Sequence, residues 1–169
     1  MKGTKIYLGA RFARHQEMER YANLLKMWRH EITSGWHSLN AETKMRDGDP
    51  EVEFNQRIAY ADQVGVFNCE LFVNFSEDPK NPPEGSARGG RHVELGLALG
   101  YQKLIFLVGP RENVFHYLPE VKHFPTAEEW LAYMAAPDAE ELLDDLSRIN
   151  VRVTDSDPPI FRAKGFARP

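Results

Sequence analysis

The sequence has 169 residues, which fits one domain whose hydrophobic core needs no disulfide or metal to support it. Its 42% hydrophobic, 27% charged and 11% aromatic residues exclude a disordered, fibrous or collagen-like chain. The net charge of −4 argues against a partner that is a nucleic-acid polymer, and no apolar run approaches the ~20 residues of a membrane span. Because no secretory signal precedes the first apolar run and Cys69 is the single cysteine, we expect a reduced, cytoplasmic protein with no membrane association.

Strand-like and helical segments alternate along the chain. The patterns predict five strands, at Lys5–Leu8, His30–Ser34, Glu70–Phe75, Leu104–Val108 and Val121–Phe124. They predict helices between and after these strands, at His15–Trp28, Glu51–Val66, Arg91–Tyr101, 113–118 (a short one), Ala127–Met134 and Ala139–Ile149. Two longer loops interrupt the pattern, a polar one over 38–50 and a Gly/Pro-rich one over 76–90.

This alternation is typical of a parallel sheet with helices on both faces. We therefore expect an α/β fold, a flavodoxin-like or Rossmann-like three-layer sandwich with a mostly parallel sheet of four or five strands. We expect one domain over 1–150 and a C-terminal tail over 151–169. Ligands of such folds bind beyond the carboxyl ends of the strands, which here lead into Gly9-Ala10-Arg11, Ser34-Gly35-Trp36, Ser76-Glu77 and Gly109-Pro110-Arg111.

The segment from Gly85 to Gly100 is the most informative part of the sequence, because a glycine-rich loop runs into an apolar helix that contains one acid, Glu94. We place Glu94 in the first turn of that helix. An acid among leucines and valine is desolvated unless it lines a binding site, which makes Glu94 a candidate catalytic group. The alternative is that Glu94 complements the positive end of the helix, where an anion gains ~0.3–1 kcal/mol.

Asp62 lies near the end of the predicted helix 51–66, just before the third strand, and we expect it near the same edge of the sheet as Glu94. Two carboxylates that converge on one site can divide their roles, one as nucleophile and the other as acid or orienting group. The alternative is that Asp62 is one more exposed acid on a helix.

The glycine loop lacks both the Gly-Lys-Ser/Thr ending of a P-loop and the GxGxxG spacing. Gly89 and Gly90 can still bring backbone N–H groups to a ligand, with Arg88 or Arg91 binding a phosphate. Arg11, after the first strand, would add a third cation, although each arginine taken singly reads as an ordinary surface residue.

The remaining candidates for chemistry are weaker. None of the six histidines forms an HxH or HExxH pair, so we expect no metal site. We read Cys69 as a buried structural thiol. Trp36 follows a strand end and is the tryptophan we retain as a candidate ligand contact.

Four segments together resemble the nucleoside 2-deoxyribosyltransferase superfamily, which also contains 2′-deoxynucleoside 5′-monophosphate N-hydrolases. These segments are KIYLGARF at 5–12, HEITSGW at 30–36, ELFVNFSE at 70–77 with Asp62 ahead of it, and GGRHVELG at 89–96. The resemblance covers roughly residues 5–135. The strand and glycine loop from position 70 to position 100 are its most specific part.

The resemblance implies that Glu94 attacks C1′ of the deoxyribose, that Tyr7 positions this nucleophile, and that Asp62 contacts the nucleoside. It also implies that Asn113 reaches into the site of a neighbouring subunit. The monophosphate hydrolases often bind the phosphate through serines, and Ser86 is close to their register without matching it. The loop 38–50 is expected to contact the base.

The implied reaction is the cleavage or transfer of an N-glycosidic bond through a covalent 2-deoxyribosyl ester, with net retention and no metal or organic cofactor. The expected ligand is a small deoxynucleoside or deoxynucleotide. Two alternatives stay open: a pure hydrolase of deoxynucleoside monophosphates, and a non-catalytic nucleotide-binding or sensor module of the same fold.

We also expect a homodimer or a higher homo-oligomer whose sites are completed across the interface. The apolar face of helix 91–101, together with Phe115, Tyr117 and Leu118, would be covered by the neighbouring subunit.

Overall fold

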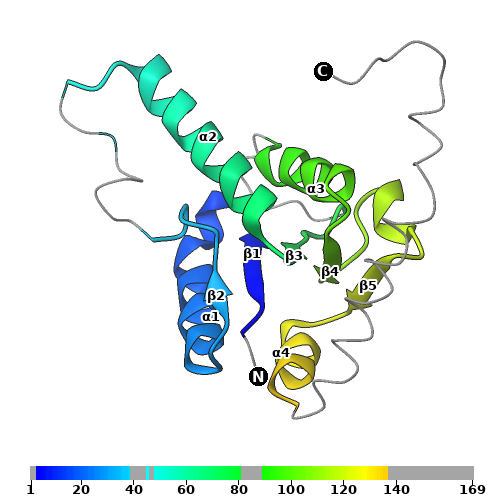
Figure 1. Cartoon of the computed structure of the whole chain (residues 1–169). Coiled ribbons are helices and arrows are strands. Elements are labelled where there is room, and N and C mark those ends of the chain that lie inside the picture. The colour runs from blue at the N-terminus through cyan, green and yellow to red at the C-terminus, as the bar shows by residue number, and fades with distance from the viewer. Residues whose placement is uncertain (1–2, 39–44, 46–47, 81–88, 137–169) are drawn as a thin grey trace, which may run out of the picture. The chain divides into compact units, whose positions relative to one another are not determined.

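The computed structural model describes residues 3–38, 45, 48–80 and 89–136 (Figure 1). The helix expected at Ala139–Ile149 and the tail over 151–169 lie outside these residues, and the domain boundary near residue 150 stays a prediction. Within the described ranges, no helix combines the length and apolar character that crossing a bilayer requires.

The strands of the described ranges form one sheet in the order β2-β1-β3-β4-β5, and all four neighbouring pairs are parallel. The strands are β1 (Lys5–Gly9), β2 (Glu31–Ile32), β3 (Leu71–Phe75), β4 (Leu104–Val108) and β5 (Val121–Phe124). The predicted α/β sandwich is therefore confirmed, and its sheet is parallel throughout.

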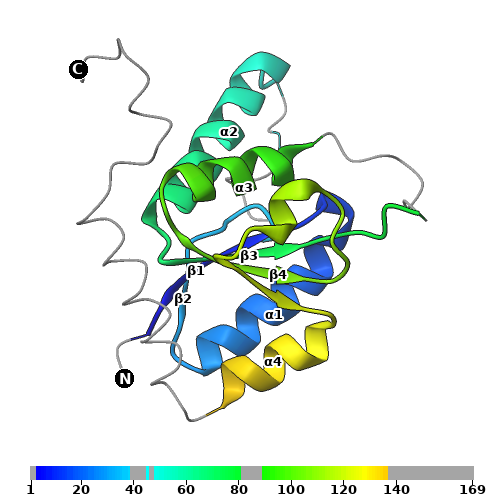
Figure 2. The same cartoon turned by 90° about the vertical axis from the view of Figure 1, so that its right-hand side faces the viewer.

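Helices cover both faces of this sheet. Figure 2 shows α2 (Glu51–Asn68) and α3 (Gly90–Gly100) on one face, and α1 (His15–Met27) and α4 (Ala127–Ala135) on the other. Two short 3-10 segments complete the described elements, η1 (Phe12–Arg14) and η2 (Val114–Tyr117). The helix expected over 113–118 is thus a single 3-10 turn.

The centre of the sheet is buried on both faces, as expected when helices pack on each side. Every residue of β3 and β4 is buried. On the α1 and α4 side, the Phe75 ring stacks on Tyr21 and meets Trp130 edge-on, with centroids 5.4 and 5.2 Å away. This aromatic cluster joins β3 to α1 and α4, so that α2 and α3 are left to shape the opposite face.

The second strand is shorter than the predicted His30–Ser34, because only Glu31 and Ile32 pair as strand residues. The Thr33 N–H still donates to the Ile6 carbonyl at 2.8 Å. Beyond it, the Leu8 N–H donates to the Ser34 hydroxyl at 3.1 Å. The Ser34 hydroxyl thus accepts the hydrogen bond that the next main-chain carbonyl of this edge strand would accept, and the pairing of β2 with β1 ends there.

The strand order places a topological switch at β1, since the chain continues from β1 to β2 on one side, whereas β3 lies on the other side of β1. Ligands of open α/β sheets bind beyond the carboxyl ends of the strands at such a switch. The end of β1, at Gly9, and the neighbouring start of α3 are therefore where a site is expected.

Candidate active site

Tyr7, Asp62 and Glu94 come from β1, α2 and α3 and meet at the face of the sheet that these two helices cover. Tyr7 is fully buried, and its hydroxyl donates a hydrogen bond to Glu94 Oε1 at 3.2 Å. The same hydroxyl interacts with Asp62. A tyrosine hydroxyl carries one proton, so it can donate to only one of the two carboxylates at a time. The structure thus brings together the three predicted catalytic residues around one shared proton donor.

Two glycines make this convergence possible. A Cβ at Gly65 would lie 2.7 Å from the Thr33 carbonyl oxygen and 2.9 Å from a Tyr7 ring carbon, so α2 can approach β1 only because residue 65 has no side chain. A Cβ at Gly9 would lie 2.7 Å from the Phe72 ring and 3.2 Å from Glu94 Oε2. Close approach of backbone to a neighbouring group is a common reason for glycine in such places.

Burial changes the titration of both carboxylates. Desolvation, reinforced by the charge of Asp62, raises the pKa of Glu94 to about 8. Desolvation also raises the pKa of Asp62 to about 6, against an opposing hydrogen bond from Tyr7. Burial and the two carboxylates raise the pKa of Tyr7 well above its ordinary value, so Tyr7 remains a neutral donor. This order of the two pKa values keeps a single proton of the pair mainly on Glu94, so Glu94 can act as a base or nucleophile only when that proton moves to Asp62 or leaves the pair.

The two oxygens of Glu94 differ in their surroundings. Oε2 is closed off from solvent, and no described residue gives it a hydrogen bond. An unpaired carboxylate oxygen is costly inside a protein, so its retention points to a bound partner or a reacting atom.

The structure corrects the expected position of Glu94 in its helix. α3 begins at Gly90, after Gly89 in a left-handed conformation with φ of 79°, and its first turn contains no acid. Glu94 therefore lies beyond the first turn, and its described hydrogen bond goes to Tyr7 rather than to the helix N-terminus. The capping role considered as an alternative is wrong. Gly89 and Gly90 occupy the predicted turn from loop to helix.

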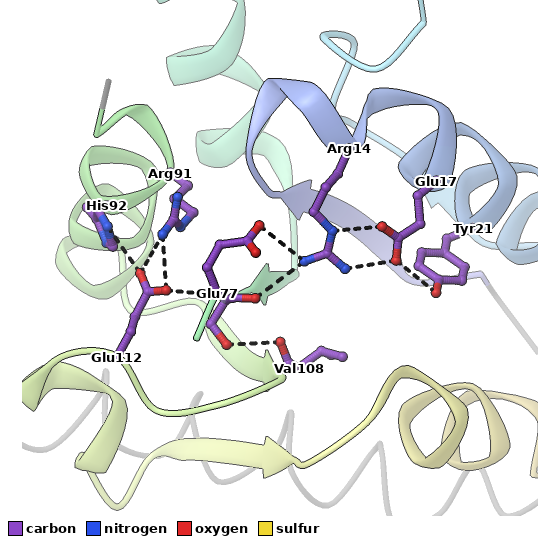
Figure 3. A network of polar contacts seen from close by, with 9 residues as sticks. Arg14, Glu17, Tyr21, Glu77, Arg91, His92, Val108 and Glu112 are labelled. Atoms are coloured by element: carbon purple, nitrogen blue, oxygen red, sulfur yellow. Dashed lines mark hydrogen bonds and ion pairs between the residues drawn. The ribbon is translucent and has the colours of Figure 1, made fainter. Parts of the chain in front are cut away.

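Glu112, which the sequence did not single out, holds the start of α3 in place (Figure 3). Its side chain is 7% exposed, and it accepts two hydrogen bonds from Arg91 Nη2, at 2.8 and 3.0 Å. It also accepts from the Glu77 N–H at 2.7 Å, and His92 Nε2 lies 3.1 Å from it. Glu112 thereby ties the segments that follow β3 and β4 to the first turn of the helix that carries Glu94.

Arg91 is buried, so its reading as an ordinary surface residue is wrong. Its Nη2 pairs with Glu112, whereas Nε and Nη1 are buried without a hydrogen-bond partner among the described residues. Its charge also acts to lower the pKa of Glu94, as the smallest of the contributions to that pKa.

A second arginine, Arg14, closes the network on the α1 side (Figure 3). It forms two hydrogen bonds with Glu17, at 2.7 and 2.8 Å, and lies 3.7 Å from Glu77. Its guanidinium also covers the Phe75 ring at 5.3 Å. Arg14 and Glu112 both hold the segment after β3 by way of Glu77, which gives the carboxyl edge of the sheet a continuous polar frame.

The other predicted residues are distributed around this edge. Arg11 is half-buried and immediately precedes η1. Trp36 is buried and donates from its ring nitrogen to the Leu8 carbonyl at 2.8 Å, so its ring borders the end of β1. Ser86 and Arg88 lie outside the described residues, as does most of the loop expected to contact the base.

Asn113 is half-buried and contacts a buried polar pair, Asn74 and His116, that sequence reasoning missed. Its side-chain oxygen accepts from the Phe115 N–H at 3.0 Å, and its amide nitrogen lies 3.1 Å from the ring of His116. The same ring nitrogen of His116 lies 3.1 Å from Asn74 of β3, and burial lowers the pKa of His116. The expected reach of Asn113 into a neighbouring subunit stays a prediction.

Cys69 is buried, and its thiol donates to the Val66 carbonyl at 3.1 Å. Burial raises its pKa to about 12, which confirms the structural reading. Over the described ranges, no group of three or more His, Cys, Asp or Glu side chains is placed to hold a metal ion.

No family model and no curated protein matches this sequence. Among solved structures, the chain is similar to the CMP N-glycosidase BcmB of Clostridium botulinum, with a TM-score of 0.50 and 17% identity over 78% of this chain and 99% of that one. A conserved protein from Enterococcus faecalis V583 matches with a TM-score of 0.40 and 15% identity, over 86% and 98% of the two chains. The protein therefore shares the α/β fold of BcmB, which agrees with the fold expected from the resemblance of the four sequence segments.

Proposed function

We propose that the protein is an enzyme that breaks the N-glycosidic bond of 2′-deoxynucleosides or their 5′-monophosphates, with Glu94 as the nucleophile. The observation that carries this proposal is the geometry of Glu94. One carboxylate oxygen receives the Tyr7 hydroxyl, and the other is buried, unpaired and adjacent to a glycine at the switch point of the sheet. This combination orients the carboxylate and leaves one oxygen to react.

In the first step, Glu94 Oε2 forms a bond to C1′ as the bond from C1′ to the base nitrogen breaks. The electron pair leaves with the base, which takes up a proton. Asp62 is the candidate donor, so the reacting form of the pair is the one in which Glu94 is ionised and the proton lies on Asp62. Because the pKa of Glu94 (about 8) is above that of Asp62 (about 6), this form is the minor one of the singly protonated pair in the free protein. Tyr7 keeps the carboxylate in position throughout.

In the second step, water or a second base attacks C1′ of the glycosyl ester and releases the Glu94 carboxylate, and the attacking group gives one proton back to the Asp62 carboxylate. Two displacements at C1′ produce net retention. With water as acceptor the product is the free sugar or sugar phosphate, and with a base as acceptor it is a new nucleoside or nucleotide. The reaction needs no redox partner.

The likeness to a CMP N-glycosidase supports the class of bond, because that name describes cleavage of a nucleotide between its base and its sugar. The likeness is one of fold, at 17% identity, so the sugar, the base and the acceptor are matters for experiment. CMP therefore belongs in the substrate panel beside the deoxy compounds.

A 5′-monophosphate is the favoured form of the substrate. Arg91 is 7% exposed, and two of its nitrogen groups have no partner among the described residues. Glu112 already pairs with Nη2, so Nε and Nη1 are the groups of Arg91 that could donate charge-assisted hydrogen bonds to a phosphate. Arg88 and Arg11 remain the sequence-based candidates for further contacts with that phosphate.

The deciding experiment incubates the full chain with CMP and with each deoxynucleoside and its monophosphate, with and without a different free base, and separates the products by chromatography. Base release alone identifies a hydrolase, and formation of the exchanged nucleoside or nucleotide identifies a transferase. Intact-mass spectrometry after rapid quenching should find the glycosyl group on Glu94. The Glu94→Gln variant should produce neither product nor adduct, whereas Glu128→Gln, an exposed acid of α4, should behave like wild type.

The proposal is refuted if none of these substrates is cleaved, or if Glu94→Gln retains the wild-type rate. Tight ligand binding without cleavage would identify the chain as a non-catalytic nucleotide-binding module. Arg88→Ala should raise KM for a monophosphate at least about tenfold and leave the nucleoside rate unchanged. The exposed Arg111 provides the matched control as Arg111→Ala. Equal losses on both substrates would contradict a role in phosphate binding.

A further inference from the structure

Asn74 is a fully buried amide on the face of the sheet that carries the candidate active site. Its register partner in β1 is Gly9, just as Phe72 is the partner of Tyr7. The Tyr7 and Phe72 rings stack with centroids 5.5 Å apart, and Tyr7 reaches Glu94 of α3, so both rings lie on the side that α3 covers. Because side chains alternate along a strand, Asn74, two residues after Phe72, points to the same side.

Asn74 lies one strand away from the unpaired oxygen of Glu94. A Cβ at Gly9 would lie 3.2 Å from Glu94 Oε2, and Gly9 has no side chain to fill that position. Neighbouring strands lie about 4.7–4.9 Å apart, so the Asn74 Cβ is about one strand spacing from the same point. The Asn74 amide and Glu94 Oε2 therefore border one space beside Gly9.

His116, from η2, occupies one end of the Asn74 side chain. Its Nε2 lies 3.1 Å from the Asn74 amide nitrogen, and its Nδ1 accepts from the Glu112 N–H at 3.3 Å. Asn74 Oδ1, at the other end, is buried and has no hydrogen-bond partner among the described residues. One ring nitrogen can pair with only one end of an amide. Whichever end faces His116, the other end of the Asn74 amide is thus left for a group outside the described chain, since a buried amide is costly when it is unpaired.

The chemistry at C1′ identifies that group. In a natural nucleoside, the base and the 3′-hydroxyl lie on opposite faces of the sugar ring. Because Glu94 displaces the base from the opposite face, it approaches C1′ on the face that carries the 3′-hydroxyl. A hydroxyl both donates and accepts hydrogen bonds, so it can pair with either end of the Asn74 amide. Ribose and 2-deoxyribose both carry this hydroxyl.

We propose that Asn74 binds the 3′-hydroxyl of the substrate sugar and that His116 is a positioning residue that fixes the Asn74 amide. This inference rests on the proposed function, and it adds a requirement to the substrate. The contact needs a free 3′-hydroxyl, because Asn74 is closed off from solvent and leaves no room for a 3′-phosphate. The substrate is then a single nucleoside or nucleotide rather than a residue within a nucleic-acid strand.

The test compares each cleaved substrate with its 3′-deoxy analogue, in the wild type and in Asn74→Ala. A site that is built to bind a hydroxyl strongly rejects the analogue without it, so the wild type should favour the 3′-hydroxy substrate at least about a hundredfold in kcat/KM. Asn74→Ala should lose activity on the 3′-hydroxy substrate and hardly any on the analogue, so that the preference falls below about tenfold. A smaller variant, Asn74→Ser, gives the same readout if Asn74→Ala fails to fold, as circular dichroism would show.

Asn23→Ala is the matched control, because Asn23 is an exposed amide of α1, on the opposite face of the sheet, and it should keep the full preference. A wild type that cleaves both sugars equally overturns the proposal. So does a preference that the folded Asn74 variants retain. If cleavage depends on Glu94 but the preference does not depend on Asn74, this inference alone fails, whereas the absence of all cleavage refutes the proposed function as well.

The role of His116 is tested by the same preference. His116→Phe removes both ring nitrogens and should lower the preference at least about tenfold. His116→Gln keeps a polar group that can pair with the Asn74 amide, and it should retain more of the preference than His116→Phe. Equal losses on both sugars in His116→Phe, with an unchanged preference, would show that His116 only stabilises the fold and would refute its positioning role.

Discussion

Replacing Glu94 by glutamine tests whether this carboxylate is needed for catalysis and, at the same time, lowers the stability of the fold. Glutamine keeps the size of the side chain and an oxygen that can accept the Tyr7 hydroxyl, but it removes the charge. If Glu94 is the nucleophile, activity should fall at least about a thousandfold, which is ~4 kcal/mol of barrier. A structural glutamate would instead lose stability when it is replaced.

Whereas activity should fall in Glu94→Gln, the free energy of unfolding should rise. The pKa of Glu94 is about 8 in the folded protein against an ordinary value of 4.5. A pKa difference of one corresponds to ~1.4 kcal/mol, so the ionised form costs roughly 5 kcal/mol at most. Partial exposure and coupling to Asp62 reduce this figure, and we expect about 1–3 kcal/mol.

The pH window follows from the same two values. Below pH 4.5 Glu94 is protonated in both the folded and the unfolded chain, so the variant gains nothing. As the pH rises towards 8, the unfolded chain ionises first, and the wild type loses stability that the variant retains. Above pH 8 the advantage of the variant is constant.

Urea unfolding of both proteins at pH 5, 7 and 9, followed by circular dichroism, measures this difference. We expect nearly equal free energies of unfolding at pH 5 and a more stable Glu94→Gln at pH 9. Glu128→Gln, on the exposed side of α4, should show no such trend. A glutamine variant that is less stable than wild type at pH 9 would show that the buried carboxylate stabilises the fold, which refutes the reasoning.

Four further outcomes follow from the same contacts. Asp62→Asn should lower kcat/KM by roughly 10²–10⁴. It should also move the acidic limb of the pH–rate profile to lower pH, because the charge of Asp62 raises the pKa of Glu94. An acidic limb that does not move would contradict this coupling between the two carboxylates. Tyr7→Phe should move that limb to higher pH, because the Tyr7 hydrogen bond lowers the same pKa, and a shift to lower pH would exclude the hydrogen bond. Glu112→Ala should destabilise the protein by about 3–5 kcal/mol in denaturant titrations, since it leaves Arg91 buried without its described counterion. A free energy of unfolding equal to that of wild type within error would mean that solvent reaches Arg91. Gly65→Ala should cost about 1–3 kcal/mol in the same titrations, because its Cβ would meet the Thr33 carbonyl oxygen at 2.7 Å, and an unchanged midpoint would mean that α2 can move away from β1.

Local sequence was sufficient for most of the architecture. The strands at Leu104–Val108 and Val121–Phe124 were predicted with their observed bounds, because short apolar runs between turn residues form buried strands wherever the fold places them. The helix after Thr126 was predicted for a similarly local reason, and the Thr126 side chain does accept the Glu129 N–H. The second strand was overestimated, because the length of an edge ladder depends on its partner, and here the Ser34 hydroxyl replaces a backbone acceptor.

In the candidate site, too, some residues could be recognised from the sequence and others only in the folded structure. Glu94 was recognisable in the sequence, because a carboxylate among apolar residues conflicts with its surroundings wherever the helix packs. Glu112 has no such signal: it follows a strand in a polar segment, and its burial exists only because Arg91 and the Glu77 N–H converge on it. Similarly, only the folded chain shows that Gly65 allows α2 to approach Tyr7.

By itself, then, the sequence determined the order of the elements, the parallel sheet and the identity of the anomalous acid, since propensity and hydrophobic period are properties of neighbouring residues. The tertiary structure alone decided how Tyr7 is shared between Glu94 and Asp62, which buried groups are paired, and that Asn74 lies on the same face of the sheet as Glu94. These features depend on groups far apart in the chain. Their distances and their solvation, and therefore their pKa values, do not exist until the sheet and its helices are assembled.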